Sequence, residues 1–180
     1  MQIILSDAIR LQPITINDQK KLFALMESIY PPAYNHLWVN GDCSFYLNLF
    51  YSKGPLQEEL SEKDADYHFV VYNEETIGIV RAQYNQTSID GTNQKATYVN
   101  RIYLGRQAQG KGVAKQLLQW VTERALLHEN HSLWLKAMDT QEQALRFYKK
   151  EGFEICGKTS LNFELLHESL RGMFIMQKEL

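Results

Sequence analysis

Apolar and polar positions follow two different periods along the chain, and each period predicts one kind of element. Two β-rich runs, Tyr67–Tyr72 and Thr76–Tyr84, flank the polar residues 73–75, which is typical of an antiparallel hairpin. The turn lacks an Asn-Gly pair, so its type stays open. Over residues 111–128, apolar side chains recur on one stripe with a helical period, which predicts an amphipathic helix.

The remaining elements are predicted in the same way. Further strands are expected at Ile9–Ile14, Ala96–Leu104, Ser132–Met138, Phe153–Ser160 and Gly172–Lys178. Further helices are expected at Leu22–Ile29, capped by Asn17 or Asp18 and ended by Pro31-Pro32, within residues 33–52, and at Gln141–Lys150. Residues 55–66 are expected as helix or loop, and residues 85–95 as a polar loop with Asp90-Gly91 at its turn. The order predicts one mixed α/β sheet with helices on its faces.

Composition narrows the classes of protein. The chain has 180 residues, 44% of them hydrophobic, which favours one domain with a sizeable core. A net charge of -2 gives no broad basic field, so we expect no general nucleic-acid binding. No apolar run approaches the ~20 residues that span a bilayer, and no basic signal segment precedes the first strand, so a cytoplasmic protein without membrane contact is expected. Cys43 and Cys156, the two cysteines, are expected to be reduced thiols.

The most informative segment joins the strand that ends at Leu104 to the helix over residues 111–128. Gly110 and Gly112 flank Lys111 at this junction, and small residues there let the backbone approach a bound phosphate closely. The unpaired N–H groups of a helix start, with the positive end of the helix dipole behind them, suit a phosphate or diphosphate. Arg106, Lys111 and Lys115 could add positive charge.

Three readings of this junction compete. It could be a turn that only links strand to helix. It could be a nucleotide-binding P-loop, because residues 105–111 nearly match GxxxxGK, but Gly112 replaces the hydroxyl residue that would hold Mg²⁺. Only about 70 residues follow the junction, which is short for the usual run of parallel βαβ units of ~30 residues each. The third reading is a site for coenzyme A.

A resemblance to a known family supports the coenzyme A site. Gln109-Gly110-Lys111-Gly112-Val113-Ala114 resembles the Q/R-x-x-G-x-G/A signature of the GNAT superfamily of N-acetyltransferases. Residues 144–153, ALRFYKKEGF, resemble its A-x-x-F-Y-x-x-x-G-F segment, and the opening residues 9–25 are similar to its first strand and helix. The resemblance covers nearly the whole chain. The C-terminal RGMFIMQKEL and the RIY strand are also weakly similar to the bacterial spermidine/spermine acetyltransferase branch.

The resemblance implies a fold and an activity. It implies a single GNAT-like domain over residues 1–180, with a mostly antiparallel mixed sheet of about seven strands and a splayed central strand pair, Ala96–Leu104 against Ser132–Met138. The implied reaction is direct transfer of acetyl from acetyl-CoA, without a metal, to a primary amine of a small molecule, a polyamine being one candidate. Acetylation of a protein N-terminus and a non-catalytic acyl-CoA-binding or sensing domain are the alternatives, and a monomer or homodimer is expected.

The resemblance also assigns site residues. Amides of the helix start hold the diphosphate, the strand end offers main-chain groups to the pantetheine arm, and Tyr148 donates a proton to the departing thiolate. Gln141 stands where family members often carry an Asn that contacts the cofactor. The implied cofactor-binding set is Ile102, Tyr103, Leu104, Gln109, Gly110, Lys111, Gly112, Val113, Ala114, Lys115, Gln141 and Tyr148.

The general base and the acceptor are less defined. The strand Ala96–Leu104 contains no acid, and Asn100 and Arg101 stand where an acidic base might be expected. Candidates from elsewhere are Glu27, Asp42, Tyr67, His68 and Tyr84. The early segment is rich in aromatic side chains, which either form ordinary core or attract a cationic amine. These aromatic residues are Tyr30, Tyr34, His36, Trp38, Phe45 and Tyr46.

Thermal unfolding with candidate ligands separates the readings of the junction. We expect acetyl-CoA to raise the unfolding temperature, because a ligand that binds only the folded state stabilises it. Mg-ATP is the matched comparison, since a P-loop protein would respond to it instead. Stabilisation by Mg-ATP alone would contradict the coenzyme A reading.

Overall fold

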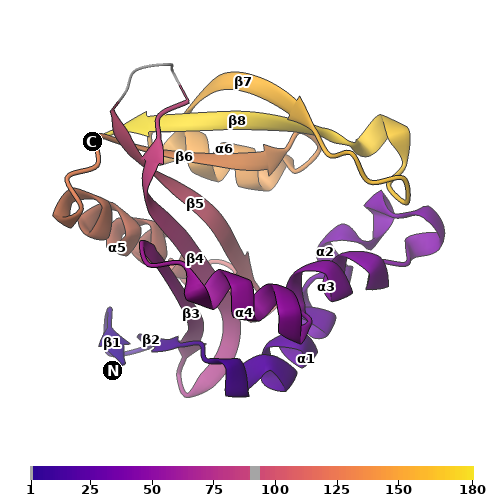
Figure 1. Cartoon of the computed structure of the whole chain (residues 1–180), viewed down its shortest axis with the longest axis horizontal. Coiled ribbons are helices and arrows are strands. Elements are labelled where there is room, and N and C mark those ends of the chain that lie inside the picture. Colours follow the sequence, from indigo (N-terminus) through magenta and orange to yellow (C-terminus); the bar gives the residue numbers. More distant parts are fainter. Residues whose placement is uncertain (1, 90–93) are drawn as a thin grey trace. The chain divides into compact units, whose positions relative to one another are not determined.

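A computed structural model describes residues 2–89 and 94–180 (Figure 1). The strands of the described chain are β1 (Ile3–Ile4), β2 (Ile9–Pro13), β3 (Ala65–Tyr72), β4 (Glu75–Thr87), β5 (Lys95–Leu104), β6 (Ser132–Met138), β7 (Glu154–Ser160) and β8 (Gly172–Glu179). Its α-helices are α1 (Gln19–Ile29), α2 (Pro31–Tyr34), α3 (Ser44–Tyr51), α4 (Lys53–Ser61), α5 (Val113–Leu127) and α6 (Glu142–Lys150). Each strand and helix predicted from periodicity is present within a few residues of its expected bounds.

The strands are hydrogen-bonded in the order β1-β2-β3-β4-β5-β6-β8-β7. The pairing of β5 with β6 is parallel, whereas β1–β2, β2–β3, β6–β8 and β7–β8 are antiparallel. The predicted mixed, mostly antiparallel sheet is therefore confirmed, with eight strands where about seven were expected. The additional strand is β1, two residues long, which no periodicity could indicate.

The chain divides into two compact units. Unit 1 comprises residues 1–81 with 101–118, and unit 2 comprises residues 82–100 with 119–180. Strands β4 and β5 and helix α5 each pass from one unit into the other, as their residue ranges show. Each unit is described by itself below.

Unit 1 contains the N-terminal helices and the hairpin of β3 with the first part of β4. Helix α1 begins after a reciprocal cap, in which the Thr15 N–H donates to the Asp18 carboxylate at 2.9 Å. Leu22 and Met26, one turn apart on α1, are fully buried, as the predicted helical stripe requires. The two prolines do not simply end this helix, because Pro31 also begins the short helix α2.

The hairpin turn between β3 and β4 uses two left-handed residues. Asn73 has φ of 44° and Glu74 has φ of 69°. Positive φ at both central residues is the mark of a type I′ turn, whose twist suits a two-residue hairpin. The turn type that the sequence left open is thus set by Asn73 and Glu74, although neither is glycine.

Strand β4 extends further than expected. Residues 85–87 belong to β4 rather than to a loop, while the Asp90-Gly91 turn lies outside the described residues. Asn130 holds this extension within unit 2, because its side chain accepts from the Asn85 N–H at 3.1 Å and from the Thr97 hydroxyl at 2.7 Å. Asn130 is 45 positions away from Asn85, so a local pattern could not reveal the contact.

Gly78 of β4 lies very close to the end of β5 in unit 1. A Cβ atom built there would lie 2.2 Å from the Tyr103 carbonyl oxygen and 2.7 Å from Leu104 Cδ2. Only a residue without a side chain fits at that separation. The Gly105 N–H donates to the Ile77 carbonyl at 2.8 Å, so the end of β5 is held against β4 at this point.

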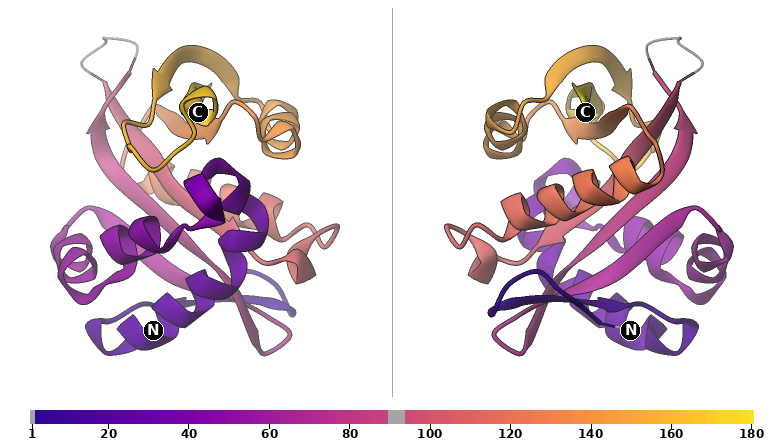
Figure 2. Two further views of the ribbon diagram at one scale, coloured as in Figure 1. Left: turned by 90° about the vertical axis from the view of Figure 1, so that its right-hand side faces the viewer. Right: turned by 90° about the vertical axis from the view of Figure 1, so that its left-hand side faces the viewer.

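Unit 2 contains a parallel ladder that ends early. Its described pairs run from Ala96–Ser132 to Tyr98–Trp134, although β6 continues to Met138. Strand β8 then lies between β6 and β7. Helix α6 lies on one side of these strands (Figure 2). The early end of the ladder agrees with the expected splayed strand pair.

We expect Gly78→Ala to destabilise the fold. The added methyl must displace the Tyr103 carbonyl, and overpacking of this kind costs about 1–3 kcal/mol of unfolding free energy. Urea unfolding measures the change. Gly54→Ala is the matched control, because a Cβ there meets no atom within 4 Å and should leave stability equal or higher. Equal midpoints for the two variants would contradict the close approach.

Candidate active site

The junction between β5 and α5 is built from a short turn and two left-handed glycines in unit 1. After Gly105, a 3₁₀ turn covers Arg106–Ala108. Gly110 and Gly112 then have φ of 70° and 72°, a conformation that L side chains rarely adopt. A Cβ at either glycine would meet no atom within 4 Å, so open space borders the backbone there. The glycines are needed for conformation, and they leave the backbone approachable.

The first turn of α5 offers unpaired donors. The Gln116 N–H donates to the Gly112 carbonyl at 3.2 Å, which is the first bond of the helix. The N–H groups of Val113, Ala114 and Lys115 precede that bond and have no acceptor within the helix. The Lys111 N–H donates to the Ala108 carbonyl at 3.2 Å, so the turn itself uses this amide. The donors for an anion are therefore concentrated at the helix start, where the helix dipole is positive.

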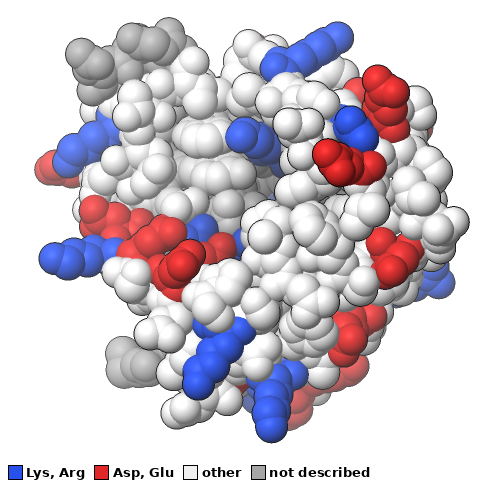
Figure 3. Space-filling view, turned by 45° about the vertical axis from the view of Figure 1, so that its right-hand side comes forward, with Lys and Arg blue, Asp and Glu red and all other residues white. Residues whose placement is uncertain are grey.

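Exposed polar side chains surround these donors. Arg106, Gln109, Lys111 and Lys115 are all exposed, whereas the Val113 side chain is buried and anchors the helix. Three of the four exposed residues are cations, which suits a ligand with two or more phosphate charges. On the face shown in Figure 3, acidic and basic side chains are interspersed.

The end of β5 is half-buried against the aromatic residues of unit 1. The Tyr103 hydroxyl lies 2.9 Å from that of Tyr46, and burial raises the pKa of both phenols. Tyr30 stacks on Tyr34 at 4.7 Å and on Tyr46 at 4.4 Å between ring centroids. Tyr30 and Trp38 are buried, so they are ordinary core, and rings stacked in this way do not form an open cage for a cation.

Most of the expected base candidates are ill-suited to accept a proton. Burial raises the pKa of Tyr67, so its phenol stays protonated at neutral pH. Tyr84 is buried and stacks on His128 with centroids 4.2 Å apart. Asp42 accepts from the Ser44 N–H at 2.9 Å, and hydrogen bonds from Ser44 lower its pKa. His68 is buried on β3, whereas Glu27 is exposed on α1.

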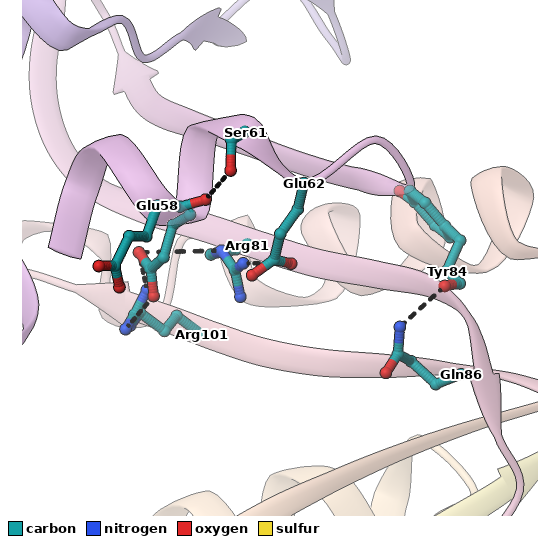
Figure 4. Close-up of polar contacts among 8 residues, drawn as sticks. Glu58, Ser61, Glu62, Arg81, Tyr84, Gln86 and Arg101 are labelled. Atoms are coloured by element: carbon teal, nitrogen blue, oxygen red, sulfur yellow. Dashed lines mark hydrogen bonds and ion pairs between the residues drawn. The ribbon is translucent and has the colours of Figure 1, made fainter.

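Arg101 holds α4 against the strands of unit 1. It forms two bonds of 2.8 Å to the carboxylate oxygens of Glu59, and Arg81 lies 2.7 Å from a Glu62 oxygen (Figure 4). Both guanidinium groups are almost fully buried, and that of Arg101 lies 5.4 Å from the Tyr51 ring centroid. The position where an acidic base might be expected thus carries a buried cation that is neutralised by Glu59.

Two further predicted residues lie in unit 2. Tyr148, on α6, is half-buried and packs its ring edge-on against Phe153 with centroids 5.7 Å apart. Gln141 is the N-cap of α6, where its carbonyl accepts from the Leu145 N–H at 3.0 Å. The loop and strand-end residues are therefore gathered in unit 1, while Tyr148 and Gln141 are held together by α6 in unit 2.

Three shielded polar atoms in unit 2 were not anticipated. Asn100 Oδ1, Trp134 Nε1 and Gln177 Oε1 are screened from solvent and have no hydrogen-bond partner in the described chain. An unsatisfied buried polar group costs about 1–3 kcal/mol, so such groups are rare without a reason. In the sequence, the three residues are visible only as polar or aromatic positions of separate strands. The order of β5, β6 and β8 in the sheet is what brings them together.

The described residues carry neither a metal-binding cluster nor a membrane-spanning helix. No group of three His, Cys, Asp or Glu side chains there is arranged to hold a metal ion. Among residues 2–89 and 94–180, no helix has the length and apolar character needed to cross a membrane.

Comparison with known proteins places these features in a family. A sequence model of the acetyltransferase (GNAT) family matches residues 23–153. An uncharacterized N-acetyltransferase of Lactobacillus delbrueckii subsp. lactis is 22% identical over 111 residues, which cover 62% of this chain and 64% of that relative. This chain thus matches less than two thirds of the length of that relative.

Solved structures share the fold. The PaiA N-acetyltransferase of Thermoplasma acidophilum, in complex with coenzyme A, aligns with a TM-score of 0.73 at 18% identity and covers 96% of this chain and 99% of its own. RimL, a ribosomal L7/L12 alpha-N-protein acetyltransferase in complex with coenzyme A, aligns with a TM-score of 0.69 at 15% identity and covers 100% and 98%. Naa50 of Arabidopsis thaliana, in complex with a bisubstrate analogue, aligns with a TM-score of 0.62 at 17% identity and covers 96% and 99%.

We expect Glu59→Gln to destabilise the protein by about 3–5 kcal/mol, because it leaves the buried Arg101 charge without its partner. Chemical unfolding measures the difference. Glu58→Gln makes the same change at an exposed neighbour on α4 and should stay within about 0.5 kcal/mol of the parent. A Glu59→Gln protein as stable as the Glu58→Gln control would show that the ion pair is not structural.

Proposed function

Because this chain belongs to the acetyltransferase (GNAT) family, we propose that it transfers the acetyl group of acetyl-CoA to a primary amine. The observation that carries the proposal is the β5–α5 junction, whose left-handed glycines expose the first amides of α5. A family match alone would be compatible with a degenerate site, but this junction keeps its donors and its open surface. The second reading, a P-loop, is set aside by the family match.

The diphosphate of coenzyme A is proposed to bind at the start of α5. The amides of Val113, Ala114 and Lys115 supply donors along the helix axis, and Lys111 and Lys115 supply charge. Coenzyme A carries an activated acyl group, so the chain needs to supply position and polarity rather than a covalent intermediate. The amide of Lys111 is excluded from this role, since its N–H already donates to the Ala108 carbonyl.

The pantetheine arm is proposed to follow the end of β5. The parallel ladder with β6 ends at Tyr98, so later residues of β5 are free of that ladder. Main-chain groups of Ile102, Tyr103 and Leu104 are then candidates for binding the arm and for donating to the oxyanion of the transfer. The close contact at Gly78 supports this role, because it fixes the position of Tyr103 and Leu104.

Tyr148 is proposed to protonate the departing thiolate. A phenol is protonated at neutral pH, and it can donate to the sulfur as negative charge develops there. The Phe153 ring, 5.7 Å from the Tyr148 ring, supports a fixed ring orientation. Gln141, at the other end of α6, is proposed to contact the cofactor with its amide, one methylene longer than the Asn of many family members.

The acceptor is proposed to be a small amine, for which a polyamine is one candidate. A protein N-terminus is the second, and it gains support from RimL and Naa50 among proteins of the same fold. A non-catalytic acyl-CoA sensor is the alternative without turnover. We also propose that the protein is cytoplasmic and acts as a monomer or homodimer.

We expect Tyr148→Phe to lower kcat by about 10²-fold while the Kd for coenzyme A stays nearly unchanged, since only a proton donor is removed. A thiol-release assay over amino acids, peptides, polyamines and aminoglycosides gives kcat, and calorimetry gives Kd. Tyr72→Phe, at the end of β3, is the control for losing a phenol hydroxyl. Equal kcat values for both variants would contradict the role of Tyr148, and no thiol release from the parent with any amine would indicate a sensor.

A further inference from the structure

One face of unit 2 carries a row of side chains across three neighbouring strands. Tyr98 of β5 pairs with Trp134 of β6, and Trp134 pairs with Gln177 of β8. Side chains that oppose each other in a ladder lie on the same face, about 5 Å apart at Cβ. The Tyr98 and Trp134 rings confirm this, because they stack with centroids 4.0 Å apart and an interplanar angle of 11°.

The row presents both kinds of hydrogen-bonding atom without partners in the described chain. Trp134 Nε1 can only donate. The Gln177 amide nitrogen donates to Glu179, and because a carboxylate can only accept, the orientation of this amide leaves Oε1 as the unpaired acceptor. Asn100, two residues after Tyr98 on the same face, adds a second unpaired acceptor, Oδ1. One donor therefore lies between two acceptors.

The residues of the row are partly exposed, although their unpaired atoms are shielded, and the row borders the end of the parallel ladder. Leu133 and Leu135, which face the other side of β6, are buried. Trp134 and Gln177 are only half-buried, and Lys136, which follows on the same face, is exposed. The described β5–β6 pairs end at Tyr98–Trp134, so the next positions along both strands border the splayed region.

We infer that this row binds the acceptor through an amide group that adjoins the reactive amine, as at the start of a peptide. The inference rests on the proposed acetyl transfer and names its acceptor class. The carbonyl of such an amide accepts from Trp134 Nε1, and its N–H donates to Asn100 Oδ1 or Gln177 Oε1. One amide thus satisfies atoms of both kinds that are otherwise left unpaired.

A polyamine fits this row less well. Its nitrogen atoms are protonated at neutral pH and only donate, so the Trp134 N–H would stay unpaired. The Lys136 ammonium, 6.0 Å from the centroid of the Trp134 ring, also repels a second cation beside the indole. Carboxylates of Glu154 and Glu179 lie at the far end of the row, next to Gln177. Because carboxylates attract cations, the test includes a polyamine as the comparison.

An NMR titration of the indole N–H signals tests the inference without turnover. The chain has three tryptophans, so the Trp134 signal is assigned by its loss in Trp134→Phe or by elimination with Trp38→Phe and Trp120→Phe. Alanyl-alanine amide and spermidine are added in turn, with and without coenzyme A. We expect the peptide amide to move the Trp134 signal saturably and spermidine to leave it in place.

The results that overturn the inference are a Trp134 signal that the peptide amide never moves, or one that spermidine moves equally. Because no reaction is needed, this result is separate from the thiol-release assay, whose failure would end the proposed transfer itself.

Kinetics of two variants add a second measurement. Trp134→Phe keeps a ring beside Tyr98 and removes only the donor, and it should lower kcat/KM for the peptide amide about tenfold, the effect of one hydrogen bond. Trp120→Phe makes the same change on helix α5 and should lower it much less. An equal effect of both substitutions would assign Trp134 a structural role only.

Discussion

The β5–α5 junction depends on one tight contact, in which Gly78 of β4 lies against the Tyr103 carbonyl of β5. At that separation no side chain fits at position 78, and the bond from the Gly105 N–H to the Ile77 carbonyl holds the chain two residues after Tyr103. The turn and the helix start follow within a few residues, so their positions derive from this contact. A site that binds a flexible, charged ligand needs donors held in place before the ligand arrives.

A buried ion pair also holds the end of β5 in place. Arg101 lies on β5 two residues before Tyr103, and Glu59 of α4 neutralises it with two short bonds. A lone buried cation is costly, whereas a paired and hydrogen-bonded one is tolerated. Position 101, one of the two strand positions considered for a catalytic acid, thus carries an arginine that attaches α4 to the sheet. β5 therefore supplies no carboxylate that could take a proton from the proposed acceptor.

Local signals predicted much of this fold and part of the site. The period of α5 was visible in the sequence because this helix buries one face, and β3 was visible as a run of residues that favour strands. The glycines of the junction were visible because few other residues adopt their conformation. Contacts between distant segments were not visible. Glu59 is 42 positions from Arg101, and Trp134 meets Gln177 only because β8 inserts between β6 and β7.

We propose above all that the first amides of α5 hold the diphosphate of coenzyme A. Titration of uniformly ¹⁵N-labelled protein with coenzyme A tests it most directly, because each backbone amide reports separately. We expect large, saturable shifts of the Val113, Ala114 and Lys115 amide signals, and much smaller shifts with pantetheine, which lacks the diphosphate. Saturable binding that leaves these three signals unmoved would contradict it.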